Sequence, residues 1–191
     1  MSTAEAELVA RAVHGDAAAQ DALLTLIRPG LVRYCRARLG RISGAFDIAD
    51  DVSQEVCIAV LRALPRYQDQ GRPFSAFVFG IAAHKVVDAQ RAALGVRAAI
   101  PVDVPPDRPD PDPGPEQRAV ANDQARQVNL LLRHLSDTQR EIVVLRVAVG
   151  LSADEVGDVL GMSAAAVRVA QSRALTKLRA LAGNQFNEVA V

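Results

Sequence analysis

The feature that most restricts the fold of this chain is a proline-rich segment near its middle. Seven of the ten prolines lie in "IPVDVPPDRPDPDPGPE", from Ile100 to Glu116. Proline lacks a backbone N–H and clashes with the preceding helical turn, so this segment cannot be helix or central strand and favours an extended form. We therefore expect folding units at 1–95 and 117–182, a linker at 96–116 and a flexible tail at 183–191.

The rest of the chain is expected to be entirely α-helical, in two small domains. Half of the residues are apolar, and Ala, Leu and Val dominate, which favours helices over sheets. In the N-terminal part apolar residues recur at three- and four-residue steps. We expect Pro29 and Gly30 to separate two helices, and Pro65 to end a later one. The apolar face of that later helix is expected to contain Ile48, Val52, Val56, Ala59 and Ala63.

The C-terminal part has the sequence signals of a helix-turn-helix. "SDTQ" (136–139) and "SADE" (152–155) have capping-box spacing, in which a hydroxyl and a side chain three residues later satisfy the free amides of a helix start. Gly150 and Gly161 are placed to end the two helices. A short helix, a tight turn at "LGM" and a further helix follow, which is the helix-turn-helix layout.

The last of these helices carries charge of one sign. "MSAAAVRVAQSRALTKLR", residues 162–179, holds four basic side chains and no acidic one. At 100° per residue, Val167, Ala170, Ala174, Leu178 and Gln171 share one face, and the opposite face holds Arg168, Val169, Ser172, Arg173 and Arg179. A solvated surface helix would normally mix charges, whereas a purely cationic face suits the phosphates and guanine edges of DNA. The preceding turn and capped helix favour DNA.

Charge, cysteines and hydropathy restrict the class of protein further. The chain has 22 basic and 22 acidic residues, with net charges of +1 in 1–95, −3 in 96–116 and +2 in 117–191. Cys35 and Cys57 lie in apolar-periodic segments away from other metal ligands, so we interpret them as buried thiols in a reducing compartment and expect no metal or cofactor. The start has no basic flank before an apolar run, and no run approaches about 20 apolar residues. A soluble, cytoplasmic protein is expected.

Three segments, in this order, resemble the sigma-70 family of RNA polymerase sigma factors. "DDVSQEVCIAVLRAL" (50–64) resembles region 2.2, the polymerase-binding helix, and "RPFSAFVFGIAAHKVVDAQR" (72–91) resembles regions 2.3 and 2.4, which open and read the −10 element. Residues 130–179 resemble region 4, which binds the −35 element. Only regions 2 and 4 are present, as in the extracytoplasmic-function (ECF) group. "VRYCRARLG" and "VRVAQSRAL" look most like the actinobacterial sigma factor D and ShbA type.

The resemblance implies three sets of contact residues. Asp51, Gln54 and Glu55 match the positions that face the clamp helices of the polymerase β′ subunit, although an acidic first helical turn is also explained by the helix dipole. Residues 66–73 match the specificity loop, which pockets a flipped −10 base. The implied −10 set is Arg66, Tyr67, Gln68, Asp69, Gln70, Gly71, Arg72, Phe77, His84 and Lys85. The implied −35 set is Arg168, Val169, Ser172 and Arg173.

Region 2 departs from the family pattern at two of these positions. Phe77 stands where the family usually has Trp. Phe74, Phe77 and Phe79 either stack on melted DNA or belong to the core, and we favour the core for Phe74 and Phe77. His84 replaces a common Asn, which puts the usual base contact there in question; it either contacts DNA, caps or faces solvent.

Region 4 departs at three positions. The usual Gly-Thr before the contacts is Ala165-Ala166, and the usual Arg after them is Ala170. These changes predict fewer phosphate contacts and a different −35 sequence. The apolar Val169 is suited to a thymine methyl group.

The resemblance also implies partners. They are core RNA polymerase, at its β′ clamp helices and β flap, promoter DNA and, commonly in the family, an anti-sigma factor; no membrane is involved. The 21-residue linker, if extended, spans about 65 Å at about 3.1 Å per residue. Its acidity suits either a path used by nucleic acid inside the polymerase or an inert spacer.

Two rival functions stay open on the residues alone. A sigma mimic would bind an anti-sigma factor without reading a promoter, but it would not need the cationic face. A stand-alone helix-turn-helix repressor would not explain the 50–64 helix. An enzyme is the least favoured class, because the paired carboxylates stand at exposed helix starts without a partnering His or nucleophile.

Overall fold

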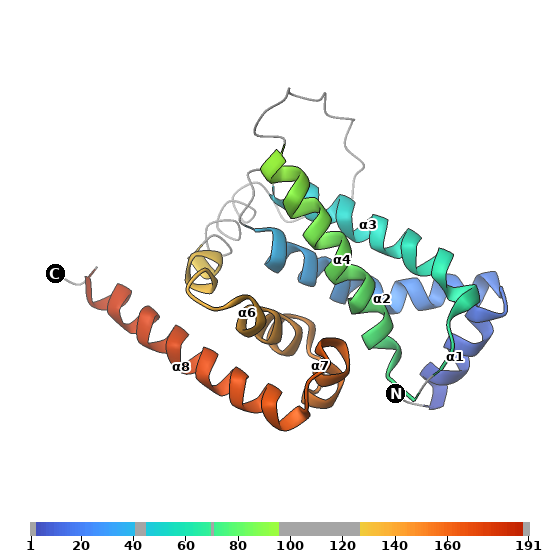
Figure 1. The fold of residues 1–191 in the computed structure, drawn as a ribbon. Helices are drawn as coiled ribbons and strands as arrows, with labels where there is room; N and C mark the ends of the chain where they lie inside the picture. The colour runs from blue at the N-terminus through green and yellow to red at the C-terminus, as the bar shows by residue number, and fades with distance from the viewer. Residues whose placement is uncertain (1–2, 41–44, 70, 96–126, 189–191) are drawn as a thin grey trace.

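Every regular element in the described part of the chain is helical, which confirms the all-helical fold class (Figure 1). This computed structural model describes residues 3–40, 45–69, 71–95 and 127–188. The N-terminal elements are α1 (Thr3–Val13), α2 (Ala17–Leu39), α3 (Ala45–Ala63), the 3-10 turn η1 (Leu64–Arg66) and α4 (Phe74–Gly95). The C-terminal elements are α6 (Asp137–Val143), the π-helical η3 (Val144–Val149), α7 (Ala153–Leu160) and α8 (Ala164–Glu188), preceded by a helical segment at 127–132.

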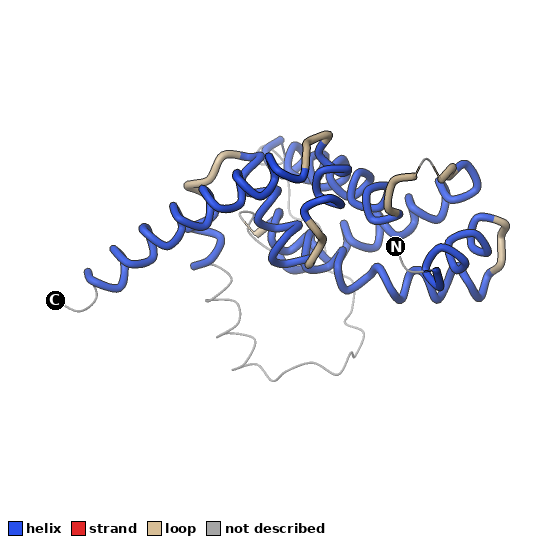
Figure 2. Tube along the Cα trace, turned by 90° about the horizontal axis from the view of Figure 1, so that it is seen from below, coloured by secondary structure: helices blue, strands red, loops and turns tan. Residues whose placement is uncertain are grey.

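The N-terminal helices form a bundle around α2. Helix α2 packs against α1, α3 and α4, and its side chains Leu23, Leu31, Tyr34 and Leu39 are fully buried. Phe74 at the start of α4 is also fully buried. Seen from below, the described part of the chain consists of helices and connecting loops (Figure 2).

Helix α2 continues through Pro29, so the predicted break at Pro29 and Gly30 is wrong. A proline inside a helix removes one backbone hydrogen bond and costs about 3 kcal/mol. Burial on both sides of the proline offsets this cost, since Leu23 precedes it and Leu31 and Tyr34 follow it in the same core. Tertiary packing therefore overrides the local sequence signal.

Helix α3 buries a face close to the predicted one. Val52 and Val56 are buried as expected, together with Ala49 and Val60. The other three predicted positions, Ile48, Ala59 and Ala63, are only half-buried. The buried face is centred between α2 and α4, because α3 packs against both helices. The helix ends at Ala63, and Pro65 lies in the following turn, as predicted.

Both predicted capping boxes are present. The Ser136 hydroxyl accepts a hydrogen bond from the backbone N–H of Gln139 at 3.3 Å. In return, the side-chain oxygen of Gln139 accepts one from the backbone N–H of Ser136 at 3.3 Å. At the start of α7, the corresponding distances between Ser152 and Glu155 are 3.1 Å and 2.8 Å. These reciprocal bonds satisfy amides that a helix start leaves free, so they fix where α6 and α7 begin.

The helix stops are also as predicted, except at the end of α8. Gly150 and Gly161 follow η3 and α7 with left-handed φ values of 95° and 66°, which glycine adopts without steric cost. Helix α8 runs to Glu188, six residues into the segment 183–191. Those six residues are helical, and the flexibility of this segment stays a prediction. The predicted linker at 96–116 lies outside the described residues.

The N-terminal bundle and the C-terminal helices touch one another. Helix α2 packs against η3, and α4 packs against α7, so α6 and α7 lie beside α2 and α4 (Figure 1). One buried apolar cluster extends from the bundle into the C-terminal helices through Ile142, Leu145 and Val156. Among the described residues no helix is long and apolar enough to cross a membrane.

Candidate nucleic-acid interface

Helix α8 exposes the cationic face that its sequence predicts. Val167 and Ala174 are fully buried against the preceding helices. The opposite face is exposed and consists of Arg168, Val169, Ser172, Arg173 and Arg179. Val169 is 51% exposed although it is apolar, so it is free to contact an apolar group of a ligand.

Two side chains from the preceding elements contact α8. Arg146 of η3 donates from Nε to the Gln171 side chain at 3.0 Å, and from Nη1 to the Leu151 carbonyl. Asp154 of α7 lies 3.4 Å from Nη2 of Arg168. The cationic face therefore has an acidic neighbour that the sequence of α8 alone does not reveal. Both partners of this pair are mostly exposed, and such pairs contribute at most about 1 kcal/mol, so Arg168 is free to exchange it for another anion.

The turn between α7 and α8 requires glycine for close approach. A Cβ added at Gly157 would lie only 2.5 Å from the backbone oxygen of Met162. The amide of Met162 donates to the Gly157 carbonyl at 2.9 Å. Gly157 thus lets the chain fold back tightly, which sets the angle at which α8 leaves α7.

The predicted specificity loop borders a pocket of about 360 Å³. The Asp69 carboxylate accepts the Gly71 amide at 2.9 Å, and Gly71 has a left-handed φ of 76°, so this stretch is a tight polar turn. The pocket is lined by Arg66, Tyr67, Gln68, Arg72, Pro73, Ala76, Phe77, Asp158 and Val159. Gln70 lies outside the described residues. The pocket combines cationic, aromatic and polar groups, which suits an unstacked base.

An aromatic cluster supports this loop. The ring centroid of Tyr67 lies 5.4 Å from that of Phe74 and 5.0 Å from that of Phe77, and the centroids of Phe74 and Phe77 are 5.6 Å apart. Phe74 is fully buried and Phe79 is 5% exposed, so both are core residues. Phe77 is half-buried and has one side in the pocket. The core interpretation is confirmed for Phe74, while Phe77 both packs on the core and lines the pocket.

The remaining predicted −10 residues lie on the outer side of α4. His84 is exposed, and its Nδ1 is 2.8 Å from the carbonyl of Gly80 one turn earlier. Lys85 is half-buried and pairs with Glu55 of α3 at 3.1 Å. Lys85 therefore lies at the junction of the predicted DNA-contacting and polymerase-contacting surfaces.

Helix α3 exposes the predicted polymerase contacts. Asp51, Gln54 and Glu55 are exposed on this helix. Beside Glu55 a groove of about 600 Å³ runs between α3 and α4, and Ile58, which is 49% exposed, lies in it. The groove also contains Ala59, Arg62, Ala63, Arg66, Phe77 and Lys85. An exposed acidic helix beside an apolar patch has the composition of a protein-binding surface.

Two family models match these same parts of the chain. Sigma-70 region 2 matches residues 23–94, and sigma-70 region 4 matches residues 131–180. The first range covers most of the bundle with its loop and groove, and the second covers the helix-turn-helix. The ECF RNA polymerase sigma factor ShbA of Streptomyces griseus is 57% identical over 178 residues, 92% of this chain and 93% of the relative. The chain belongs to the ECF sigma factors of the sigma-70 family.

Other relatives agree with this assignment. The ECF sigma factor SigD of Mycobacterium tuberculosis is 54% identical over 172 residues, covering 90% of this chain and 81% of SigD. The solved structure of CnrH in complex with the cytosolic domain of CnrY has a TM-score of 0.68 at 28% identity, covering 95% of this chain and 98% of CnrH. The predicted resemblance to the ShbA and sigma factor D type is confirmed. As a sigma factor the protein is a subunit for transcription initiation and not an enzyme.

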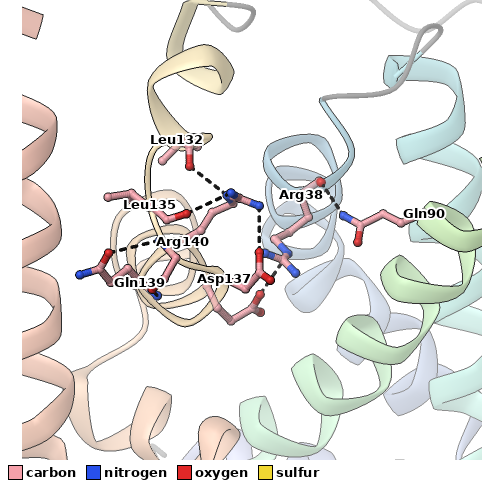
Figure 3. A network of polar contacts seen from close by, with 9 residues as sticks. Arg38, Gln90, Leu132, Leu135, Asp137, Gln139 and Arg140 are labelled. Atoms are coloured by element: carbon pink, nitrogen blue, oxygen red, sulfur yellow. Dashed lines mark hydrogen bonds and ion pairs between the residues drawn. The ribbon is translucent and has the colours of Figure 1, made fainter. Parts of the chain in front are cut away.

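The ECF sigma factor also has a buried polar network that sequence reasoning missed (Figure 3). Arg140 of α6 is 7% exposed and donates to the carbonyls of Leu132 and Leu135 at 3.0 Å and 3.2 Å. On α2, the carbonyl of Arg38 accepts a hydrogen bond from the side-chain amide of Gln90 on α4 at 3.0 Å. The sequence signals such a buried polar contact only by a charged residue within an apolar-periodic helix. That signal does not reveal which distant residue the charged side chain contacts.

The two cysteines are free thiols inside the bundle. Cys35 is buried and Cys57 is half-buried. Burial raises the pKa of the Cys35 thiol to about 12 and also raises the pKa of Cys57. Both thiols are therefore protonated and unreactive near neutral pH. Within the described ranges no cluster of His, Cys, Asp and Glu could hold a metal ion.

Proposed function

We propose that this ECF sigma factor binds core RNA polymerase through α3, reads the −10 element with the 66–73 loop and α4, and reads the −35 element with α8. The observation that carries the proposal is the exposed face of α8, which is cationic around one apolar side chain and belongs to a helix-turn-helix. Such a face fits the major groove, where Arg reads guanine and an apolar group contacts the thymine methyl.

For the −10 element, the pocket beside Tyr67 and Phe77 supports reading of an unpaired base. Stacking on aromatic rings is worth about 1–3 kcal/mol per base and does not need a duplex. Arg66 and Arg72 border the same pocket and are placed to neutralise phosphates. His84 and Lys85 lie further along α4 and extend this surface.

For the polymerase, we propose contact between Asp51, Gln54 and Glu55 and the β′ clamp helices, and contact between region 4 and the β flap. The proposed division of the chain is region 2 at 1–95, a linker at 96–116 and region 4 at 117–182. Because transcription takes place in the bacterial cytoplasm, we propose that location for the protein.

An anti-sigma factor is a further proposed partner. CnrH was solved with the cytosolic domain of CnrY, and RpoE of Bartonella quintana, which shares the fold at a TM-score of 0.58 and 20% identity, was solved with the anti-sigma factor NepR. A sigma mimic would keep such a partner and lose promoter recognition.

Run-off transcription with purified core polymerase and a mapped promoter tests the proposed function. We expect a transcript that depends on both the sigma factor and the promoter. No transcript from any mapped promoter, together with tight binding to an anti-sigma factor, would favour the mimic.

A further inference from the structure

Arg146 joins the successive parts of the helix-turn-helix in region 4. It lies in η3, and its Nε donates to the side-chain oxygen of Gln171 on α8 at 3.0 Å. Nη1 of the same guanidinium donates to the backbone carbonyl of Leu151, which lies between η3 and α7. Because the donors of a guanidinium have a fixed planar geometry, these two bonds hold α8 at a defined place relative to η3 and to the start of α7.

A π-helical turn of the backbone presents this side chain. The amides of Gly150 and Leu151 both donate to the carbonyl of Leu145, at 3.1 Å and 3.0 Å. In this turn Leu145 is fully buried, Arg146 is half-buried and Val147 is 61% exposed. Segments of π-helix are rare and frequently occur at functional sites, so the backbone here points to a role for Arg146 beyond packing.

Gln171 lies at the border between the buried and the exposed face of α8. It is half-buried, four residues after the fully buried Val167 and three residues after the exposed Arg168. Residues three and four apart are neighbours on a helix surface, so Gln171 adjoins both faces. Ser172, a proposed DNA contact, follows it directly. Any rotation of α8 about its axis therefore moves Gln171 and the proposed DNA contacts together.

The bond between Arg146 and Gln171 resists such a rotation. The buried stripe of α8 consists of small apolar side chains, Val167 and Ala174 among them, and apolar packing is non-directional. A rotation of about 20° moves the outer atoms of a helix by about 2 Å, which breaks a hydrogen bond of 3.0 Å. The bond therefore fixes the rotation of α8 more sharply than the apolar stripe does.

Two further contacts to α8 are weaker constraints. Arg168 pairs with Asp154 at 3.4 Å, and the Lys177 ammonium donates to the carbonyl of His134. Both contacts are exposed, and water and salt weaken exposed polar contacts. The contact of Arg146 is partly buried, where a hydrogen bond is electrostatically stronger.

We propose that Arg146 is a positioning residue for −35 recognition: through Gln171 it sets the rotation of α8, and so decides which exposed side chain of that helix faces which base pair. The inference rests on the proposed function of α8 and deepens it, because it assigns specificity to a residue outside that helix. Arg146 acts from within the helix-turn-helix, since its Nε and Nη1 are engaged by Gln171 and Leu151.

Base preference at the −35 element tests the proposal. Run-off transcription would use the full chain with core polymerase, on a library of single-base variants of the mapped −35 sequence. We expect Q171M to change the output ratio between the preferred sequence and its variants by about 2- to 30-fold, the range for residues that act through packed contacts. Met fills the space of Gln but has no amide oxygen for Arg146. R146M should give the same pattern, and the double variant R146M/Q171M should add nothing further.

Matched variants separate loss of the bond from loss of a side chain. Q171E keeps an oxygen acceptor for Arg146, so it should keep the wild-type base preference, while its negative charge lowers binding to all sequences alike. R133A removes an exposed basic side chain outside α8 and should leave the preference unchanged. If R146M does not fold because the Leu151 carbonyl has lost its donor, the contrast between Q171M and Q171E still decides.

Two physical measurements distinguish positioning from other roles of Arg146. A phosphate contact would make the slope of log K against log[salt] for promoter binding smaller by about 0.9 in R146M than in Q171M, whereas positioning predicts equal slopes. Thermal unfolding of the free protein tests the bond itself. The losses in Tm of R146M and Q171M should not add in the double variant, because both changes remove one shared interaction.

The results that would overturn the proposal differ from failure of the proposed function. Lower thermal stability with unchanged base preference in Q171M and R146M would make Arg146 purely structural. A changed preference in Q171M alone would make Gln171 a direct reader of DNA, and a smaller salt slope in R146M alone would make Arg146 a phosphate contact. If neither the wild type nor any variant gives a transcript, the proposed sigma function fails, and the Tm losses still decide whether Arg146 and Gln171 are coupled.

Discussion

At the scale of single residues, the candidate DNA contacts differ in how strongly they are held. Arg168 has Asp154 within 3.4 Å, whereas Arg173 is exposed on the same face of α8. Both side chains can turn toward a major groove because neither is buried. Their effects on promoter recognition should therefore be separable from effects on folding.

The variants R168A and R173A are expected to lose roughly 1–3 kcal/mol each in −35 binding if each reads a base. Promoter output in run-off transcription should fall, while the thermal unfolding of the free protein changes little. A matched control is R133A, which removes an exposed basic side chain of the same region that lies outside α8. Unchanged −35 binding and output for both variants would remove these residues from the site.

Glu155 links the stability of α7 to pH. Its burial would raise its pKa, but hydrogen bonds from Ser152 and Ser75 outweigh this and lower the pKa below the ordinary 4.5. Because the folded-state pKa is lowered, the stabilisation is present above pH 4.5 and is lost as pH falls through the folded-state value. The free energy of unfolding of wild type minus that of E155Q should be constant above about pH 5.5 and shrink in more acidic buffer. A difference that does not change with pH would contradict this assignment.

At the scale of elements, the helix-turn-helix depends on the approach of α7 to the start of α8. The variant G157A would place a Cβ 2.5 Å from the Met162 backbone oxygen, and overpacking of this kind costs about 1–3 kcal/mol. We expect lower thermal stability of region 4 and weaker −35 binding. The control G183A has no heavy atom within 4 Å of its added Cβ and should stabilise α8 by up to about 1 kcal/mol. Equal behaviour of the two variants would contradict the packing argument.

The −10 loop is a second element whose role can be transferred. Residues 66–73 are polar, contain the Gly71 turn and border the pocket between η1 and α4. Grafting this loop from an ECF relative with a different −10 preference should move the preference with it, measured by transcription from a promoter library. If the folded graft keeps the original preference, another element reads the −10 sequence.

At the scale of the whole molecule, charge and geometry both predict dependence on core polymerase. The chain is neutral overall, with 22 basic and 22 acidic residues, and neutralisation of phosphates drives sequence-independent affinity for DNA. Free sigma factor should therefore bind promoter duplex weakly. Core polymerase would hold both regions at promoter spacing and raise the effective concentration of the second contact.

We expect mobility-shift assays to show promoter binding and open-complex formation only when core is present, with D51A, Q54A and E55A weakening the assembly with core. The charge-matched control is D88N, on α4 outside these surfaces. Tight, specific duplex binding by the free protein would contradict the charge argument.

Local structure and the family assignment followed from the order of residues in short segments. Capping boxes, terminal glycines and the one-sided charge of α8 act within a few residues, so their outcome could be predicted from spacing alone. The family motifs likewise lie in contiguous segments, which is why the ECF assignment could be predicted, while the candidate contacts stay predictions. The burial of Phe74 in the core was also predicted, and the structure shows it.

Features that depend on partners distant in the chain could be seen only in the packed helices. Pro29 lies within a continuous helix because the core on both sides outweighs a local penalty. Asp154 beside Arg168 and Glu141 between Tyr34 and Arg38 join residues 14 and about 100 positions apart, and no periodicity encodes which charges meet. Side-chain burial and pairing follow from how whole helices pack, so the docking of region 4 on region 2 is visible only once both are folded.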